Sequence, residues 1–591
     1  MRKITLLIVL ACLLGLGTTA QNQMQTPFEK NGPNTTTTYS EMISFYKGLE
    51  AASPMVKVVE VENGTDVGRP LHMVVLSASK IFHPVPLRQA DTRIVMIMNG
   101  IHPGEPDGID ASMILARDLV MDKLFSPLLE HIAVCIIPSY NVDGMLVRNS
   151  VSRANQNGPE SYGFRGNGQN LDLNRDFIKQ DSKNARAFAK LYTEWRPDIF
   201  IDTHTSNGAD YQYIMTYISS LKDKMDPGLG GYMETTLNAE LSAKMKEANY
   251  EMAPYVQTKS WEMVPDSGLI AFNDLPRYSL GYAALFGAMT YTTESHMLKK
   301  HEDRVFGTYH FLMNLLKIVN RDRKIIGRLR KEALEALKKQ TNFTLRWKVD
   351  MGSSTKLNFK GFAASISPSA ITGFPRISYD ATNPFTKEIP YYSKYVPEIS
   401  VTKPTAYIIP QAWDEVVERL KLSGVAMQRL SEDVTVEAAM YRITKYKFAE
   451  EPYEGHSPIS GIEVKKQNEN VQFFAGDYVA FTDQEANRFL VEALEPQGTD
   501  SYLSWNFFDP IFSRKEYFSP YIFEAEAKQM LETDPKLKQE LQDKVKADTA
   551  FAKSDWAQMD FIYQRSKHME PGYLRYPVAR IEKVTKLPLA K

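Results

Sequence analysis

The sequence predicts an α/β fold: a mixed, mostly parallel sheet flanked by helices, followed by a smaller mixed α+β region. Apolar runs without polar alternation are typical of strands buried on both faces of a sheet. Segments with helical apolar spacing separate these runs, and this alternation favours a sheet covered by helices on both sides. Strands are expected at 94–98, 131–137, 198–203 and 289–293, and helices at about 107–121, 182–194 and 236–248.

Shorter elements are expected before and after this core. Ser40 or a neighbour is a candidate N-cap for a helix, because apolar residues at helical spacing follow it. Val56–Val61 and Leu71–Leu76 are β-rich runs separated by the turn dipeptide Asn63-Gly64, which predicts a strand pair. Downstream, we expect a charged helical connector at 323–339, short strands at 357–362, 396–401 and 406–409, a helix at 411–422 and helix-prone sequence at 525–552.

Length and composition indicate more than one globular domain. The chain has 591 residues, of which 43% are hydrophobic and 24% charged. We therefore expect a catalytic domain at 40–340 and an accessory region at 345–591, β-rich and then helical, with no cluster of chemically reactive residues. Lys and Arg number 70 against 71 Asp and Glu, so no basic surface for nucleic acid is predicted.

The N-terminus has the features of a secretory signal. Residues 1–20 combine early positive charges, a short apolar run and small residues before Gln21, and 21–39 is a polar, flexible lead-in. We expect export to the periplasm or outside the cell. No membrane span is expected in the mature chain, because the N-terminal apolar run is short for a span and no later run is long enough to stop transfer. An alternative is a lipoprotein anchored through Cys12, although Leu10 fits that cleavage box poorly. Removing the signal leaves Cys135 alone, which excludes an intramolecular disulfide.

A candidate metal site follows the strand at 94–98. In the stretch Asn99 to Asp107, NGIHPGEPD, His102 and Glu105 flank a Pro-Gly bend that allows both side chains to face one ion. His204 closes the strand at 198–203 and completes two histidines and one glutamate, a ligand set that leaves one position of a zinc ion open for water. Asp202 beside it either pairs with His204 in an ordinary strand end or orients a metal ligand.

Other histidines lack such partners. His301-Glu302-Asp303-Arg304-Val305 begins like the His-Glu-x-x-His zinc motif but ends in valine, so the helical zinc-protease class is excluded. Surface positions or satisfied core positions are the expected roles of the other unpaired histidines, which are His72, His83, His131, His310, His456 and His568.

Two further stretches complete a pattern. Gly163-Phe164-Arg165-Gly166 leads into Asn174-Arg175 on a long loop, and Glu294 ends the strand at 289–293. With His102-Pro103-Gly104-Glu105 and His204, these residues resemble, in order and separation, the zinc carboxypeptidases typified by pancreatic carboxypeptidase A. The resemblance covers roughly residues 40–320 and suggests an exported bacterial member.

The resemblance implies a role for each residue. Glu294 would be the general base on the zinc-activated water. Arg165 would stabilise the oxyanion, although Arg153 lies nearby and a surface position is ordinary for an arginine. Asn174 and Arg175 would bind the terminal carboxylate of the substrate. The ligands of the single zinc ion would be His102, Glu105 and His204.

The family's mobile tyrosine and specificity pocket are less defined in this sequence. Tyr278 and Tyr282 are both candidates for the tyrosine, and neither is assigned. The pocket residue falls within 277–287, which contains no carboxylate, so the sequence favours neutral or hydrophobic side chains over Lys or Arg.

Three functions are consistent with the sequence. The first is an exported zinc metallocarboxypeptidase that hydrolyses the C-terminal bond of peptides bearing a free carboxylate. The second is a zinc amidase or deacylase acting on carboxylate-bearing substrates such as cell-wall peptides. The third is an inactive binding protein whose 345–591 region contacts glycans or partners; the complete set of ligands and base argues against it.

Overall fold

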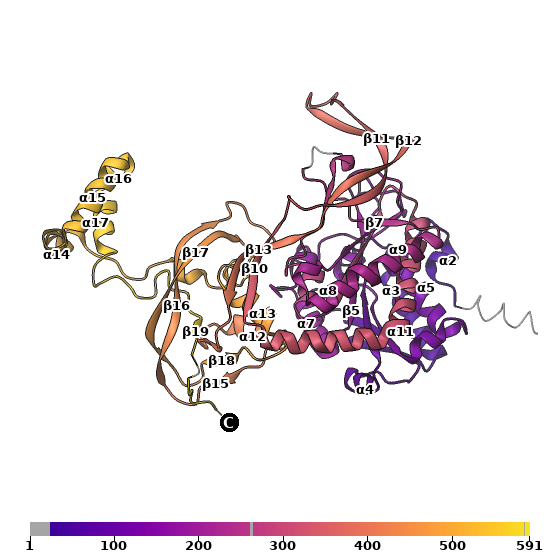
Figure 1. The fold of residues 1–591 in the computed structure, drawn as a ribbon, viewed down its shortest axis with the longest axis horizontal. Helices are drawn as coiled ribbons and strands as arrows, with labels where there is room; N and C mark the ends of the chain where they lie inside the picture. Colours follow the sequence, from indigo (N-terminus) through magenta and orange to yellow (C-terminus); the bar gives the residue numbers. More distant parts are fainter. Residues whose placement is uncertain (1–23, 261–263, 584, 591) are drawn as a thin grey trace, which may run out of the picture.

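The computed structural model describes residues 24–260, 264–583 and 585–590. The predicted signal at 1–20 and the first residues of the lead-in lie outside this range. Figure 1 shows an elongated molecule with the mixed sheet and its helices at one end, a second β-rich body beside it and a small helical bundle that stands apart at the far end. No helix among the described residues is both long and apolar enough to cross a bilayer.

The large sheet confirms the predicted α/β class. Its eight strands run in the order β1-β2-β4-β3-β5-β9-β6-β7. The central strands β4, β3, β5 and β9 are mutually parallel, while the β1–β2, β2–β4 and β6–β9 pairs are antiparallel. The strands are β1 (Val56–Val61), β2 (Leu71–Leu76), β3 (Arg93–Met98), β4 (Ile132–Ile137), β5 (Ile199–Ser206), β6 (Met215–Ser219), β7 (Met252–Pro254) and β9 (Met289–His296).

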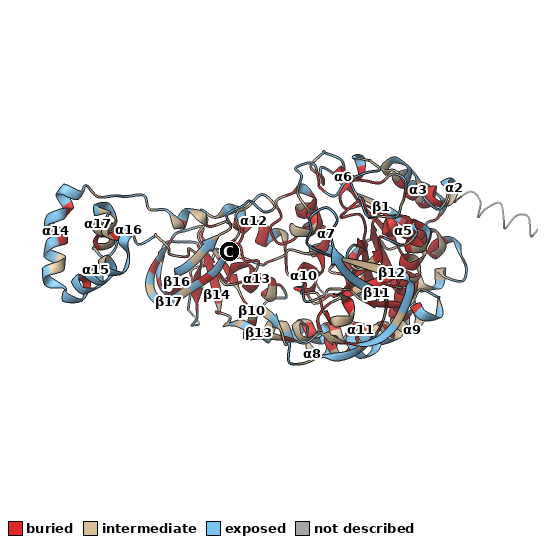
Figure 2. Cartoon of the chain, turned by 90° about the horizontal axis from the view of Figure 1, so that it is seen from above, coloured by how far each residue is buried: buried red, intermediate tan, exposed pale blue. Residues whose placement is uncertain are grey.

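Helices bury both faces of this sheet. Alternate residues of β3 enter different cores: Ile94, Met96 and Met98 pack on one face, and Val95 and Ile97 on the other. The first face is covered by α7 (Lys183–Trp195) and α10 (Ser279–Ala284), and the second by α3 (Tyr39–Ala52), α5 (Asp107–Met121), α9 (Asn238–Glu247) and α11 (His301–Lys339). Buried residues accordingly fill the centre of this body in Figure 2.

Three sequence expectations need adjustment. The N-cap of α3 is Thr38, whose side chain and Glu41 form a capping box. The connector predicted at 323–339 is the second half of α11, a helix of 39 residues that runs from the large sheet to the β-rich body (Figure 1). Strands β5 and β9 extend beyond 203 and 293 because their parallel pairing continues to Ser206 and His296, so His204 and Glu294 lie inside strands.

The region after α11 contains several small sheets. One has six strands in the order β15-β18-β14-β19-β16-β17, and β11 and β12 form a long hairpin that pairs with β8 (Leu269–Ile270). The strands are β10 (Asn342–Val349), β11 (Thr355–Pro368), β12 (Pro375–Tyr392), β13 (Tyr395–Thr402), β14 (Ala406–Ile409), β15 (Gln428–Arg429), β16 (Val434–Phe448), β17 (Ile459–Phe473), β18 (Tyr478–Phe481) and β19 (Ala579–Ile581).

Two helices pack in this body and four form the distal bundle. The predicted helix at 411–422 begins at Asp414, and the helix-prone sequence at 525–552 is divided by Asp534 and Asp548, which cap new helices. The helices are α12 (Asp414–Leu422), α13 (Asn487–Leu494), α14 (Pro520–Thr533), α15 (Pro535–Ala547), α16 (Thr549–Ala552) and α17 (Asp555–Tyr563).

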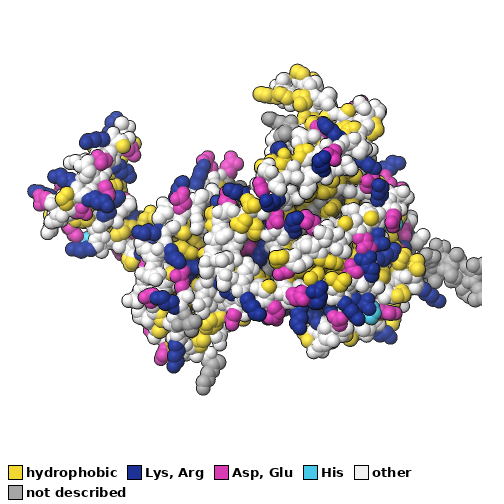
Figure 3. Space-filling view, viewed as in Figure 1, with side chains coloured by type: hydrophobic (Ala, Val, Ile, Leu, Met, Phe, Trp, Pro, Cys, Tyr) yellow, Lys and Arg dark blue, Asp and Glu magenta, His cyan; other side chains and the backbone are white. Residues whose placement is uncertain are grey.

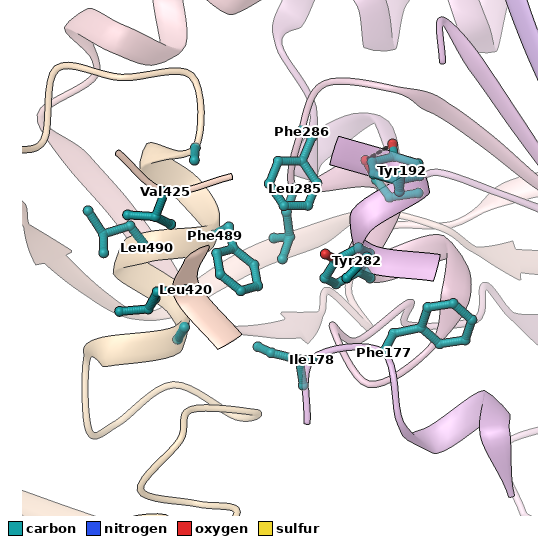
Figure 4. Packing of buried hydrophobic residues seen from close by; sticks show 14 of the residues in the cluster. Phe177, Ile178, Tyr192, Tyr282, Leu285, Phe286, Leu420, Val425, Phe489 and Leu490 are labelled. Carbon is teal, nitrogen blue, oxygen red and sulfur yellow. Dashed lines mark hydrogen bonds between the residues drawn. The ribbon is translucent and has the colours of Figure 1, made fainter. Parts of the chain in front are cut away.

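An apolar core joins the two large bodies. Phe489 of α13 stacks on Phe286 with ring centroids 5.5 Å apart and contacts the edge of Tyr282 at 5.8 Å. Figure 4 shows Leu420, Val425 and Leu490 approaching the same place from the accessory side. The accessory region is therefore packed firmly against the large sheet body. The division at 340–345 stays a prediction.

The face of the molecule seen in Figure 3 carries interspersed charges of both signs. Apolar side chains gather at the projecting tip of the β11–β12 hairpin, where Ile371 is 92% and Phe374 is 74% exposed.

Candidate metal centre and active site

A cavity of about 560 Å³ lies at the carboxyl ends of β3, β5 and β9. This is where an open α/β sheet presents its ligands. All seven residues singled out from the sequence line this cavity: His102, Glu105, Arg165, Asn174, Arg175, His204 and Glu294.

His102, Glu105 and His204 converge on one point. They each offer a ligand atom, and these atoms lie within 4.8 Å of one another. Glu105 Oε1 lies 3.2 Å from His102 Nδ1, and Glu105 Oε2 lies 3.0 Å from His204 Nδ1. Ligands about 2.0–2.2 Å from a tetrahedral zinc ion have separations close to these values.

Two carboxylates fix the outer nitrogens of both histidines. Asp172 Oδ1 lies 2.9 Å from His102 Nε2, and Asp202 Oδ2 lies 2.8 Å from His204 Nε2. A proton held on each Nε2 leaves Nδ1 as the lone-pair nitrogen that faces the shared point, as metal-binding histidines require. Arg165 Nη1 donates to that lone pair of His102 at 3.2 Å. The donor set therefore fits a zinc ion.

Glu105 is held as a charged carboxylate. Its Oε2 accepts from the Thr205 backbone N–H at 2.9 Å, and its Oε1 accepts from Arg153 Nη1 at 2.9 Å. Burial acts to raise the pKa of Glu105, but Arg153 and His102 outweigh burial and hold the pKa well below its usual range. For His204, burial acts to lower the pKa, and Asp202 with Glu105 raises it above the ordinary value. A metal ion at this point would replace the proton on Nδ1 that faces Glu105.

Glu294 stands beside the metal ligands because of strand register. It is the parallel partner of His204 across the β5–β9 pair, so both side chains emerge on the same side of the sheet. Burial raises the pKa of Glu294 to about 8, with His204 opposing and Glu105 adding to the shift. This perturbation in a cleft is typical of an acid–base residue.

Asn174 and Arg175 lie on the short helix η2 (Leu173–Arg175). Asn174 Oδ1 accepts from the Ser279 backbone N–H at 3.1 Å. Arg175 Nη1 donates to the Asn174 carbonyl at 2.8 Å, and its guanidinium lies 4.7 Å from the centre of the Tyr278 ring. These contacts hold a cation at the cavity wall.

Arg165, the candidate for the oxyanion, and the nearby Arg153 both line the cavity. Arg165 is 44% exposed and donates to Asp172 Oδ2 through Nη2 at 2.7 Å, while Arg153 is more enclosed and binds Glu105. Both therefore contact Glu105, Arg153 Nη1 at 2.9 Å and Arg165 Nη1 at 3.5 Å, and Arg165 is the more exposed of the two.

The tyrosines divide clearly. Tyr278 lines the cavity, whereas Tyr282 is buried in the core and donates to Ser423 Oγ at 3.1 Å. Tyr255 also lines the cavity and was not found from the sequence, because it follows β7, a three-residue strand without a strand-length apolar run. Ile218, Phe272 and Leu280 supply an apolar part of the wall.

The accessory region also reaches this edge, which the sequence did not predict. Tyr453 and Glu454 contact the loop that carries Asn174 and Arg175. His456 is not free, because its Nε2 lies 2.8 Å from Asp181 Oδ2.

Comparisons with known proteins agree with this geometry. Residues 42–216 match the family model described as zinc carboxypeptidase. The chain is 23% identical over 479 residues to "Carboxypeptidase 2" of Trichophyton tonsurans, covering 78% of this chain and 82% of that protein. "Carboxypeptidase 2" of Trichophyton rubrum is 22% identical over the same shares of both chains. An alignment of this length extends beyond the predicted catalytic domain.

Solved structures with similarity to the chain include two carboxypeptidases. A metallo-carboxypeptidase from Burkholderia cenocepacia is 17% identical, with a TM-score of 0.36 over 48% of this chain and 70% of that one. Carboxypeptidase A from Helicoverpa armigera is 16% identical, with a TM-score of 0.36 over 51% of this chain and 74% of that one.

Proposed function

We propose that this chain, whose residues 42–216 match the zinc carboxypeptidase family model, is an exported metallocarboxypeptidase that removes C-terminal residues from peptides with a free carboxylate. The observation that carries the proposal is the convergence of all seven candidate residues on one cavity. Both metal-facing histidines are also oriented there by carboxylates, of which Asp202 is buried and Asp172 is partly buried.

We assign the metal to His102, Glu105 and His204. A zinc ion held there supplies Lewis-acid polarisation of the substrate carbonyl and of the attacking water. Glu294 must be deprotonated to act as a base, and the positive charge of a bound ion would favour that ionised form.

The side chains around the metal then divide the work. Glu294 takes the proton from the attacking water and passes it to the leaving amine. Arg165 stabilises the negative oxygen of the tetrahedral intermediate. Asn174 and Arg175 bind the terminal carboxylate, for which the guanidinium fork gives a bidentate pair.

The cavity wall favours a neutral C-terminal side chain. Ile218, Phe272 and Leu280 are apolar, so a hydrophobic residue gains burial there, whereas Lys or Arg would lose hydration without a matching carboxylate. The signal-like composition of residues 1–20 supports the export of the protein.

Activity of purified protein on hippuryl-phenylalanine tests the function. We expect hydrolysis that a chelator abolishes and added zinc restores, with one zinc per chain by elemental analysis. C-terminally amidated peptides should be poor substrates. Preferential cleavage of amidated or acylated substrates would instead favour the amidase or deacylase, and a carefully prepared chain that binds no zinc would favour an inactive binding protein.

A further inference from the structure

A sharp turn of the accessory region ends beside the active site. It connects β16 to β17 and consists of Tyr453-Glu454-Gly455-His456, here called the tip turn. Tyr453 N–H donates to the His456 carbonyl at 2.7 Å, and His456 N–H returns a bond to Tyr453 at 3.1 Å. Glu454 and Gly455 have φ of 49° and 78°. Two successive left-handed residues give the tight hairpin connection in which the outer side chains have fixed directions.

The tip turn is bound to the segment 172–181, which carries the proposed carboxylate clamp. Glu454 Oε2 accepts from the Asp172 backbone N–H at 2.7 Å. The Glu454 carbonyl accepts from Lys179 Nζ at 2.9 Å, and His456 Nε2 lies 2.8 Å from Asp181 Oδ2. Contacts at both ends of the segment fix the turn against it.

The most direct contact is with Arg175 itself. Its Nε donates to the Tyr453 hydroxyl at 3.0 Å, its Nη1 donates to the Asn174 carbonyl at 2.8 Å, and its plane lies over Tyr278. A guanidinium has five N–H donors. In Arg175, Nε–H and one N–H of Nη1 bind the protein, and the other three remain for a ligand. Holding Nε and Nη1 fixes the plane of the fork, and a pre-oriented fork loses less entropy when it binds a carboxylate.

Tyr453 is in turn supported by its own region. Its ring stacks at 20° on Trp505, which is buried. Arg277 lies over the same indole at 5.0 Å and forms an ion pair with Asp500 at 2.6 Å. Arg277 directly precedes Tyr278, so residues of the accessory region brace the segments on both sides of the Arg175 guanidinium.

From these contacts we propose that Tyr453 is a positioning residue for the substrate-carboxylate site, so that the accessory region completes the active site. The inference rests on the proposed role of Arg175 as the carboxylate-binding cation. The apolar packing in Figure 4 stabilises the position of Tyr453, since Phe489 and its neighbours hold the accessory region against the sheet body.

Direct binding measurements separate this role from catalysis. In zinc-loaded protein with Glu294→Gln, peptide is bound without turnover, and calorimetry gives Kd for hippuryl-phenylalanine and for its C-terminal amide. Tyr453→Phe removes one hydroxyl and keeps the stacked ring. We expect Kd for the free acid to rise about 3- to 10-fold, as for loss of a partly exposed hydrogen bond to a charged group, with Kd for the amide unchanged.

Tyr446→Phe is the matched control. Tyr446 lies on β16 and packs against Phe512 with ring centroids 4.4 Å apart, so this substitution should leave both Kd values unchanged. Adding Tyr453→Phe to Arg175→Ala should cause no further loss, because the hydroxyl acts only through the guanidinium.

Three outcomes would overturn the inference. The first is an equal Kd for the free acid with and without Tyr453→Phe. The second is equal weakening of acid and amide, which indicates a general structural role. The third is Glu294→Gln protein that binds the acid and the amide equally. Hydrolysis is assayed separately in protein that retains Glu294. Binding of the acid without hydrolysis would contradict the proposed function while leaving the positioning role intact.

Discussion

The two halves of the chain meet at one cavity but contribute to it differently. The sheet body supplies each side chain that we assign to metal, proton transfer and oxyanion, all at the carboxyl ends of β3, β5 and β9 or on the loop beside them. The accessory region supplies Tyr453 and Glu454, which bind residues of that loop. The reactive side chains thus come from the sheet body, whereas both halves contact the loop that carries Asn174 and Arg175.

This difference explains why the metal ligands could be recognised in the sequence and the residue that positions Arg175 could not. His102 and Glu105 must share a turn three residues apart, and such spacing is visible along the chain. Arg175, in contrast, needs only one hydroxyl as a partner, and Tyr453 supplies it from 278 positions away. Many tyrosines in the sequence could meet that need. Its role depends on the docking of the two bodies.

The largest expected effect would test the division of labour in the sheet body. Glu294→Gln should lower kcat by about 10²- to 10⁴-fold, because the general base is lost, while one zinc per chain is retained. Stopped assays on hippuryl-phenylalanine and elemental analysis measure the two quantities. Turnover equal to the parent would remove Glu294 from the mechanism.

The junction between the halves can be broken at Phe489. Phe489→Ala leaves a cavity between Phe286, Tyr282 and α13, and should lower the free energy of unfolding by about 3–5 kcal/mol. Denaturant titration measures this, with Phe374→Ala at an exposed site as the control. Two independent unfolding transitions in the parent would show that the halves do not share a cooperative core.

A smaller effect, on zinc affinity, is expected from a substitution at Asp172, whose carboxylate contacts the proposed ligand His102. Asp172→Asn replaces the carboxylate that faces His102 Nε2 with a neutral amide and should weaken zinc binding about 10- to 100-fold. Competition with a chromogenic chelator gives the affinity. Asp350→Asn, on a loop that does not line the cavity, should bind zinc like the parent. Unchanged affinity in Asp172→Asn would deny this carboxylate a part in holding the ligand.

The smallest effect should be at the other hairpin of the accessory region. Ile371→Ser lies at the projecting β11–β12 tip and should change stability by no more than about 0.5 kcal/mol and leave kcat/KM unchanged. Denaturant titration and steady-state assays measure the two quantities. A marked fall in kcat/KM would show that peptides contact this tip, and that the accessory region reaches the substrate by a route other than the tip turn.

Much of the sheet body followed from local pattern. Because buried strands are continuous apolar runs, the ranges of β3 and β4 were predicted to within one residue, and the metal ligands were expected at the ends of β3 and β5. Tyr255 escaped because β7 is only three residues long and owes its place to pairing with β6. The first half of α11, which begins at His301, was not predicted, because only the charged stretch at 323–339 was identified as helical. Tyr453 and Trp505 could not be placed, since stacking between distant segments leaves no periodic trace.

The register between β5 and β9 determines whether the general base lies beside the metal ligands. His204 faces Glu294 only in the observed alignment, and a shift by one residue sends the carboxylate to the opposite side of the sheet. The same shift would move Met289 and Tyr291, which are fully buried in the second core, to the opposite face. The apolar residues that hold these two strands in register therefore also set the position of the base relative to the metal ligands.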